Sequence, residues 1–210
     1  MKITKLEHSG LAIEKDHKTI LCDPVEFKTI TPPFDNVVAI VITHKHSDHF
    51  QPELLMKLRN ANPTVEIFAP ADTTPLLSGT ITIRGGDTRE LDGFKLTFFG
   101  KDHAPVVANQ IPCENIGVVI DDKVVNPGDA FTLPPIKNPQ LLCVPVSAPW
   151  CKISESIDFV NKVRPEMVVP LHDAVLSDIG RTFSISWLES TCTSLGIKLH
   201  NLAPGAFIEI

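Results

Sequence analysis

Short apolar runs bounded by turn residues recur along most of the chain, and they constrain the fold more than any other feature. Each run has the length of a strand and is rich in β-branched residues. The expected strands are residues 11–14, 19–24, 37–44, 64–70, 80–86, 94–100, 116–122, 123–129, 141–146 and 167–172. The sequence therefore predicts a globular protein with many strands and few helices.

Helical signals are confined to three segments. Residues 52–60 begin at Pro52, a residue that favours the first helical position, and Ser154 is expected to cap a helix that runs to residue 163. The third expected helix covers residues 181–196 and ends at Gly196. Its apolar stripe is formed by Phe183, Trp187, Leu188, Cys192 and Leu195.

The chain has 210 residues, 43% of them hydrophobic, and no low-complexity linker divides it, so we expect one domain over 1–210. A weak internal sequence similarity, an echo of one half of the chain in the other, suggests two pseudo-repeated halves, roughly 1–105 and 106–210. Residues 8–24 and 114–130 both resemble a hairpin around a charged turn that ends in an aspartate. After each, a later apolar strand ends in a histidine, although chance similarity explains the echo equally well.

Charge and targeting signals limit the classes of partner and the cellular location that we expect. The formal net charge is -6 and the basic residues are scattered singly, so nucleic acid is not expected as a partner. The first residues lack the features of a secretory signal, and no apolar run approaches the ~18 residues of a membrane span, which predicts a cytoplasmic protein. Five cysteines without a CxxC pair predict free thiols. A homo-oligomer remains an open alternative.

One stretch, THKHSDHF at residues 43–50, concentrates potential ligands. His44, His46, Asp48 and His49 follow the apolar run 37–42, so they are expected on a loop at the end of a buried strand. Imidazole and carboxylate are ligands of zinc-like and manganese-like ions, and the short spacing lets one turn direct several of them inward. The alternative is a solvated histidine-rich turn, which four donors in six residues make a poor explanation.

Three further donors occupy comparable places. His103, Asp129 and His172 each come just past an apolar run, from where side chains of several strands can converge at one sheet edge. Singly, each reads equally well as an ordinary polar residue at a strand end. Together with residues 44–49 they make seven candidate ligands, enough for two metal ions. The chain has no P-loop, GxGxxG or GxSxG motif that would suggest another chemistry.

The motif HxHxDH at residues 44–49, followed by His103, Asp129 in a GD pair and His172, and preceded by Asp23 in LCDP, resembles the metallo-β-lactamase superfamily. The resemblance covers nearly the whole chain. It implies an α/β fold, a four-layer αββα sandwich of two mixed β-sheets with helices on the outer faces. It also implies a dinuclear metal site at one edge of the sheets.

The resemblance implies a role for each ligand. One metal is held by His44, His46 and His103, the other by Asp48, His49 and His172, and Asp129 bridges them. Asp23 is expected to orient a ligand histidine, and Asp48 to guide the attacking hydroxide or relay its proton. The implied cofactors are two divalent ions, with Zn²⁺ preferred and Mn²⁺ or Fe²⁺ as alternatives.

Residues 7–14 and 145–178 are similar to the branch that contains ascorbate-6-phosphate lactonase and many predicted metal-dependent hydrolases. Relatives of the flavodiiron type have Glu in place of His46, and thiolate-containing β-lactamases have Cys in place of Asp129, so neither group fits. His8 becomes a candidate pocket residue, with capping of the first strand as the alternative. Trp150 is a candidate pocket wall, with plain packing as the alternative. Four charged residues beside the ligand segments are expected on the solvated surface, with contact to a polar or phosphorylated substrate as the alternative: Lys101, Asp102, Asp173 and Asp178.

The function implied is that of a metal-dependent hydrolase. Hydroxide held by the dinuclear site would cleave an ester, lactone or related bond of a small polar substrate. One alternative is a phosphodiesterase or nuclease of the same fold, which would need a basic groove near the metals. The other is a metal-binding sensor protein without catalytic turnover.

Overall fold

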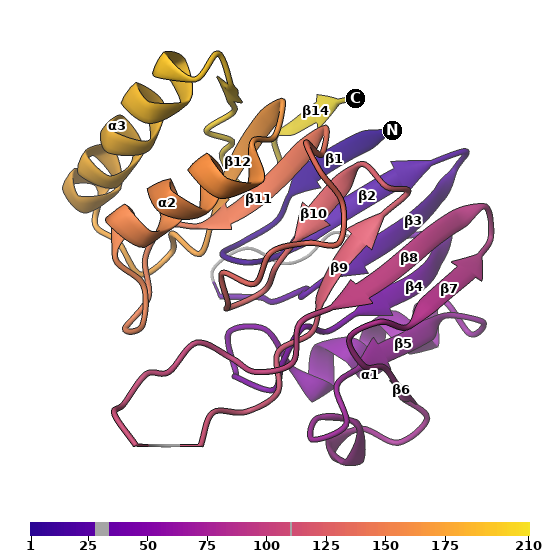
Figure 1. Ribbon diagram of the computed structural model, residues 1–210. Coiled ribbons are helices and arrows are strands. Elements are labelled where there is room, and N and C mark those ends of the chain that lie inside the picture. The colour runs from indigo at the N-terminus through magenta and orange to yellow at the C-terminus, as the bar shows by residue number, and fades with distance from the viewer. Residues whose placement is uncertain (28–33, 110) are drawn as a thin grey trace.

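The computed structural model describes residues 1–27, 34–109 and 111–210. Two seven-stranded sheets face each other (Figure 1). The first sheet has the order β14-β1-β2-β3-β4-β5-β6. Its strands are β14 (Phe207–Glu209), β1 (Lys2–Lys5), β2 (Leu11–Lys15), β3 (Lys18–Cys22), β4 (Val37–Val41), β5 (Glu66–Ala69) and β6 (Ile81–Thr82).

The second sheet has the order β13-β12-β11-β10-β9-β8-β7. Its strands are β7 (Thr88–Leu91), β8 (Phe94–Phe99), β9 (Gly117–Ile120), β10 (Val124–Asn126), β11 (Leu141–Pro145), β12 (Met167–Leu171) and β13 (Lys198–Leu199). The expected strand over 80–86 is reduced to the two residues of β6. Strands β1, β7, β13 and β14 lie outside the expected set because they are short or mostly polar.

The two sheets repeat one pattern of strand directions. Strands β1 to β3 are antiparallel and β4 to β6 continue in parallel, just as β8 to β10 are antiparallel and β11 to β13 continue in parallel. Asp16 and His17, which form the two-residue turn between β2 and β3, both have positive φ, as a type I′ hairpin turn requires, and so do Asp121 and Asp122 in the three-residue connection between β9 and β10. The sheets do not divide at residue 105, because β7 and β8 already belong to the second sheet.

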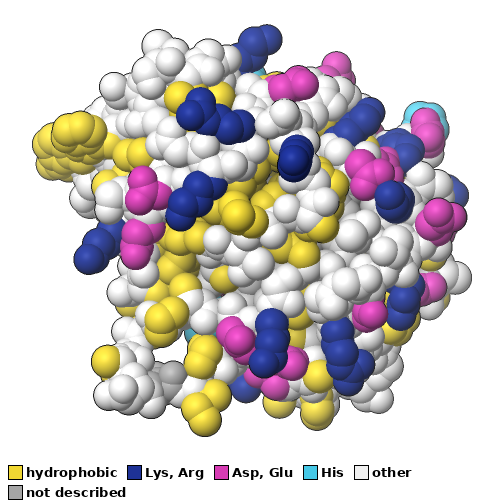
Figure 2. All heavy atoms as spheres, in the orientation of Figure 1, with side chains coloured by type: hydrophobic (Ala, Val, Ile, Leu, Met, Phe, Trp, Pro, Cys, Tyr) yellow, Lys and Arg dark blue, Asp and Glu magenta, His cyan; other side chains and the backbone are white. Residues whose placement is uncertain are grey.

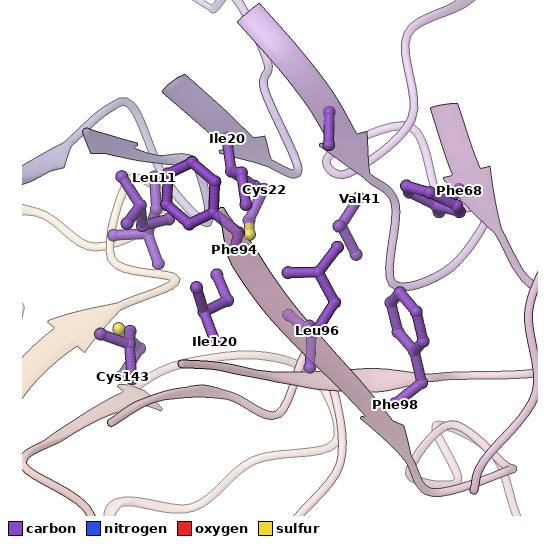
Figure 3. Packing of buried hydrophobic residues seen from close by; sticks show 14 of the residues in the cluster. Leu11, Ile20, Cys22, Val41, Phe68, Phe94, Leu96, Phe98, Ile120 and Cys143 are labelled. Carbon is purple, nitrogen blue, oxygen red and sulfur yellow. The ribbon is translucent and has the colours of Figure 1, made fainter. Parts of the chain in front are cut away.

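Apolar side chains from the inner faces of both sheets form the central core (Figure 3). The residues labelled there are Leu11, Ile20, Cys22, Val41 and Phe68 from the first sheet, and Phe94, Leu96, Phe98, Ile120 and Cys143 from the second. A second cluster joins the outer face of the first sheet to α1 (Pro52–Ala61). A third joins the second sheet to α2 (Ile153–Val163) and α3 (Asp178–Ser194), which lie on the opposite side of the molecule (Figure 1). The predicted four-layer αββα sandwich is therefore confirmed.

The helix starts differ in part from the prediction. Pro52 is the first residue of α1, as predicted. The prediction that Ser154 caps α2 was wrong, because the cap position is Lys152, whose backbone N–H donates to Glu155 Oε2 at 2.8 Å. Helix α3 begins three residues earlier than predicted, at Asp178, and its cap is Ser177, whose hydroxyl accepts the Gly180 N–H.

The apolar stripe predicted for α3 is only half buried. Leu188 and Cys192 are buried in the outer core, but Phe183 and Trp187 are 65% and 63% exposed. The helix therefore faces the sheet with Ile185, Leu188 and Cys192, and the aromatic residues lie on its other face. Sequence spacing alone could not separate the two faces, because apolar residues occur on both.

The cysteines are free, as predicted, and Cys22, Cys143 and Cys192 are buried. In the described parts of the chain, no helix is both long and apolar enough to span a membrane. Figure 2 shows one face of the molecule, on which lysine and arginine side chains are interspersed with acidic ones.

The two faces of α3 give a stability prediction. Leu188→Ala opens a cavity under the helix and should lower the free energy of unfolding by about 2–5 kcal/mol. Trp187→Ala removes an exposed ring and should change the same quantity by less than about 1 kcal/mol. Urea denaturation followed by circular dichroism measures both, and equal losses would contradict this orientation of α3.

Candidate metal centre

The seven candidate ligands gather at one edge of the sandwich because each follows a strand that ends there. Residues 43–49 follow β4, His103 follows β8, Asp129 follows β10 and His172 follows β12. Backbone hydrogen bonds tie these loops to one another: Ile116 N–H donates to the Thr43 carbonyl, and Ala104 N–H donates to the Asp129 carbonyl. The convergence predicted from the sequence is therefore observed.

The candidate ligand atoms form two outer groups, and a third group of His44, His49 and Asp129 joins them. Ring nitrogens of His44, His46 and His103 lie within 4.8 Å of one another. Asp48, His49 and His172 form the second group within the same distance, and His8 belongs to it as well. These are the two sets of three that the family resemblance implied, with His8 as an unexpected fourth member of the second set.

Asp129 lies between the two groups. One carboxylate oxygen, Oδ1, is 3.2 Å from His49 Nε2, and the other, Oδ2, is 3.2 Å from His172 Nε2 and 3.5 Å from His103 Nε2. A carboxylate so placed can reach a cation in either group. This is the position expected of a bridging ligand.

Four of the histidines are held by the ring nitrogen that points away from the centre. His49 Nδ1 is 2.8 Å from Asp23 Oδ2, and His172 Nδ1 is 2.6 Å from the Ser147 carbonyl oxygen. His103 Nδ1 contacts the Ala104 carbonyl, and His44 Nδ1 contacts the Thr43 hydroxyl. Each acceptor favours a proton on Nδ1, which leaves the Nε2 lone pair free and directed inward.

The inward atoms have no hydrogen-bond partner, although they are buried. They are Nε2 of His44, His49, His103 and His172, and Oδ1 of Asp129. Buried polar atoms nearly always have a hydrogen-bond partner, so a cluster of five buried atoms without one requires an explanation. Neutral imidazole nitrogens around a carboxylate form a donor set that fits divalent ions of the zinc type.

Asp23 lies under this cluster, as predicted. It is fully buried, and it accepts hydrogen bonds from the Thr43 backbone N–H and hydroxyl, both at 2.7 Å, besides its contact with His49. The Thr43 hydroxyl thereby links Asp23 to the ring of His44. One carboxylate therefore orients a histidine from each metal group.

Burial and neighbouring charges shift the pKa values of the clustered histidines and of Asp129. Burial lowers the pKa of His44, and the charge of His49 lowers it further. Burial also opposes charge on His49 and His172, but the nearby carboxylates outweigh it and raise the pKa of His49 to about 10 and that of His172 to about 9. For Asp129, the neighbouring imidazoles outweigh burial and hold the pKa of the carboxyl well below its usual range. The carboxylates around His49 and His172 therefore favour positive charge in this cluster, which a divalent cation would also supply.

Backbone strain is concentrated at the same place. His8, Asp23 and His172 have positive φ values of 55°, 43° and 60°, which non-glycine residues rarely adopt. Gly128, directly before Asp129, has φ of 62°, and a Cβ atom there would lie 2.4 Å from Asn115 Oδ1. Only glycine lets the chain turn so closely at this point.

His8 and Trp150 both contact the candidate ligands. His8 Nε2 is 3.3 Å from Asp48 Oδ2, and its ring centroid is 3.9 Å from that of His172. The Trp150 indole N–H donates to Asp129 Oδ2 at 2.9 Å, and its ring lies edge-on to His103. His8 also lines a cavity. The hydrogen bond to Asp129 shows that Trp150 does more than pack against its neighbours.

Sequence reasoning missed the residues that support the ligands. Asn115 is buried and accepts the Asp129 N–H at 2.8 Å, and Thr43 joins Asp23 to His44. Thr43 comes directly before His44, so its place in the sequence could have suggested a supporting role. Asn115 lies outside the ligand motifs, and no sequence signal links it to Asp129. Cys113 was also missed as a neighbour; its sulfur is 3.7 Å from His46 Nε2.

Asp173 departs from its prediction. Lys101, Asp102 and Asp178 are exposed as predicted, but the prediction that Asp173 is a solvated surface charge was wrong. Asp173 is buried and accepts from Lys5 Nζ at 2.7 Å, while Arg181 Nε lies 3.0 Å away. Lys5 is fully buried, and alternation along β1 places it on the same face as Ile3.

Comparison with known sequences identifies related proteins. The family model described as the beta-lactamase superfamily domain matches residues 2–172. Protein Rv0786c of Mycobacterium tuberculosis is 32% identical over 188 residues, which cover 86% of this chain and 88% of that protein. The UPF0173 protein PYRAB01190 of Pyrococcus abyssi is 28% identical over 182 residues, or 82% of this chain and 83% of the relative.

Solved structures share the fold at lower identity. Igni18, a metallo hydrolase from Ignicoccus hospitalis, superimposes with a TM-score of 0.74 at 22% identity over 99% of this chain and 97% of its own. The metallo-β-lactamase fold protein YhfI from Bacillus subtilis gives a TM-score of 0.71 at 15% identity over 99% and 98%. At these identities the likeness concerns the fold.

The raised histidine pKa values give a pH prediction. His49 and His172 carry folded-state pKa values of about 10 and about 9 against 6.5 for the free side chain, so their stabilising contribution is complete below pH 6.5 and is lost as the pH rises through 9 to 10. The metal-free protein should therefore lose unfolding free energy over this range. Zn²⁺ must displace the same protons, so its apparent affinity should rise by up to about tenfold per pH unit for each proton displaced.

Urea denaturation of the metal-free protein at several pH values measures the first effect, and competition with a chromophoric chelator measures the second. His49→Gln provides the comparison, because it removes one of the two titrating imidazoles and should flatten part of the pH dependence. A metal-free stability that rises from pH 6.5 to 10 would contradict the assignment of protons to these rings.

Proposed function

The chain belongs to the β-lactamase superfamily, and from that premise we propose that it is a metal-dependent hydrolase. The observation that carries the proposal is the set of five buried, unpartnered ligand atoms that face one space. A folded protein rarely keeps such atoms without a ligand. We propose two divalent ions, with Zn²⁺ first and Mn²⁺ or Fe²⁺ as alternatives, since imidazole and carboxylate accept all three.

The proposed ligand sets follow the two groups of side chains. His44, His46 and His103 would hold one cation. Asp48, His49 and His172 would hold the other, and Asp129 would reach both. When bound, the two cations supply Lewis acidity that polarises the scissile bond and acidifies a water molecule.

Asp48 is the candidate for positioning that water. Its side chain is 33% exposed, the Asp129 and His172 side chains around it are almost fully buried, and its backbone carbonyl is fixed by the Ser9 hydroxyl at 2.9 Å. A carboxylate at the accessible side of the centre can accept a proton of the attacking water and so orient its oxygen towards the substrate.

His8 fixes Asp48 from the other side. The Ala174 backbone N–H approaches His8 Nδ1 at 3.3 Å, so Nδ1 is the acceptor and Nε2 carries the proton. That proton points to Asp48 Oδ2. His8 therefore restricts the rotation of Asp48 and can stabilise a proton shared with it.

A small molecule is the proposed substrate, and an ester or lactone the proposed bond. Lys45, a basic side chain within the histidine loop, is paired with Asp72 at 2.8 Å. This pairing reduces the positive charge that a phosphate backbone would need. Hydrolysis of a lactone or ester needs no such charge beyond the metals themselves.

Metal analysis and a hydrolysis panel test the proposal together. The purified protein should bind two equivalents of Zn²⁺ or Mn²⁺ and hydrolyse a lactone or ester. Activity should vanish on chelation and return on adding metal, and Asp48→Asn should lower kcat by at least about 100-fold. Faster cleavage of single-stranded RNA would favour the nuclease alternative, and two tightly bound metals without any hydrolysis would favour a sensor.

Trp150 offers a second test with a matched control. Trp150→Phe keeps the aromatic packing against Phe131 and His103 but removes the N–H that holds Asp129, so kcat/KM and metal affinity should fall by about 10–100-fold. Trp187→Phe changes an exposed tryptophan and should leave both unchanged. If Trp150→Phe also left both unchanged, the indole N–H would have no positioning role.

A further inference from the structure

A cavity of about 340 Å³ lies beside the metal centre, between the turn after β1 and the segment that leads from His172 into α3. Much of its lining is apolar: Phe27, Ala174, Val175, Leu176 and Pro204. Phe27 and Val175 are 49% and 65% exposed, so apolar surface continues to the mouth of the cavity. Half-exposed apolar side chains around a hollow are typical of a ligand site.

One imidazole ring separates the cavity from the candidate ligands. His8 lines the cavity, and the same ring lies 3.3 Å from Asp48 and packs against His172. Phe27 meets the His8 ring edge-on, with centroids 5.6 Å apart. A substrate whose reacting carbonyl lies at Asp48 can therefore place the rest of its chain beyond His8, against these apolar side chains.

The charges around the cavity do not favour an anion. Among the residues that the structure describes, its lining contains three carboxylates, from Glu7, Asp173 and Asp178, and one cation, Arg181. Arg181 is already occupied: Nη2 donates to Asn201 Oδ1 at 2.9 Å and to the Leu202 carbonyl at 3.1 Å, and Nε lies beside Asp173. Asp173 is in turn bound by the buried Lys5. Among these described residues, an anionic group would meet more carboxylates than cations.

We propose that this cavity binds an uncharged, apolar acyl chain, so that the protein acts on neutral esters or lactones with a medium-length chain and not on phosphorylated sugars. The substrate class rests on the hydrolase function proposed above, whereas the apolar site stands on the cavity alone. Since one water-sized group takes roughly 30 Å³, the cavity accommodates on the order of eight carbon atoms with some space left at the mouth.

A series of p-nitrophenyl esters from acetate to dodecanoate, assayed with the zinc-loaded protein, tests the substrate class. Each added CH₂ should raise kcat/KM by up to about fourfold until the chain reaches about eight carbons, after which the gain should stop. An ester with a terminal carboxylate on an eight-carbon chain should react at least about tenfold more slowly than octanoate. Equal rates along the series, or a preference for the carboxylated ester, would overturn the proposal.

Two substitutions of exposed residues locate the effect. Val175→Asp places a charge in the cavity lining and should lower the ratio of kcat/KM for octanoate to that for acetate by about tenfold or more. Ile179→Asp adds the same charge four residues further along the chain, in the first turn of α3, at a residue that is 72% exposed and does not line the cavity, and should affect neither ester. Equal effects of the two variants on octanoate would show that the cavity does not hold the chain.

Binding without turnover separates this proposal from the hydrolase function. Octanamide should bind the metal-free protein, shift NMR signals of Val175 and Leu176, and bind at least about tenfold more weakly to Val175→Asp than to Ile179→Asp. If octanamide binds in this way but no ester is hydrolysed, the hydrolase function fails and the apolar site stands. If esters are hydrolysed but octanamide does not bind at the cavity, the apolar site fails and the hydrolase function stands.

Discussion

The structure depends on how a buried carboxylate, Asp129, is surrounded by imidazole rings whose outer nitrogens are already bound. His49 is fixed by Asp23 and His172 by the Ser147 carbonyl, so both rings have only their inner nitrogens to offer. Taking these groups out of water is costly unless a cation or shared protons balance the carboxylates. The surrounding fold must therefore hold several loops rigidly enough to keep the rings in place.

The paired sheets supply that rigidity. Each sheet contributes a hairpin followed by parallel strands, and the apolar layer between the sheets locks them together. Strand ends from both sheets then reach one edge, where the strained residues His8, Asp23 and His172 adopt positive φ. Strain of this kind persists only where neighbouring structure enforces it, and here the enforcing contacts are the same hydrogen bonds that orient the candidate ligands.

His8 connects the candidate metal centre with the apolar cavity that we propose as a substrate site. On one side it donates towards Asp48, and on the other it lines the apolar cavity. The chain around it is held by the buried Lys5–Asp173 pair, which ties β1 to the residue directly after His172. The His8 ring thus holds Asp48, the accessible carboxylate of the candidate metal centre, at a fixed distance from the cavity. A fixed distance of this kind would align the reacting bond of a substrate with the rest of its chain.

The sequence by itself determined the strands of the two sheet cores and the seven candidate ligands, because apolar period and ligand chemistry are local properties that a single chain displays. The loop from His44 to His49 could be identified in this way, whereas Asp129 was singled out only together with the other donors and through the family resemblance. Only the tertiary structure decided that Phe183 and Trp187 face outward, that Asp173 is buried against Lys5, and that Trp150 donates to Asp129. Those outcomes depend on which surfaces pack together in the folded chain. Lys5 and Asp173, for example, are separated by more than a hundred residues in the sequence, and a local sequence pattern contains no information about such contacts.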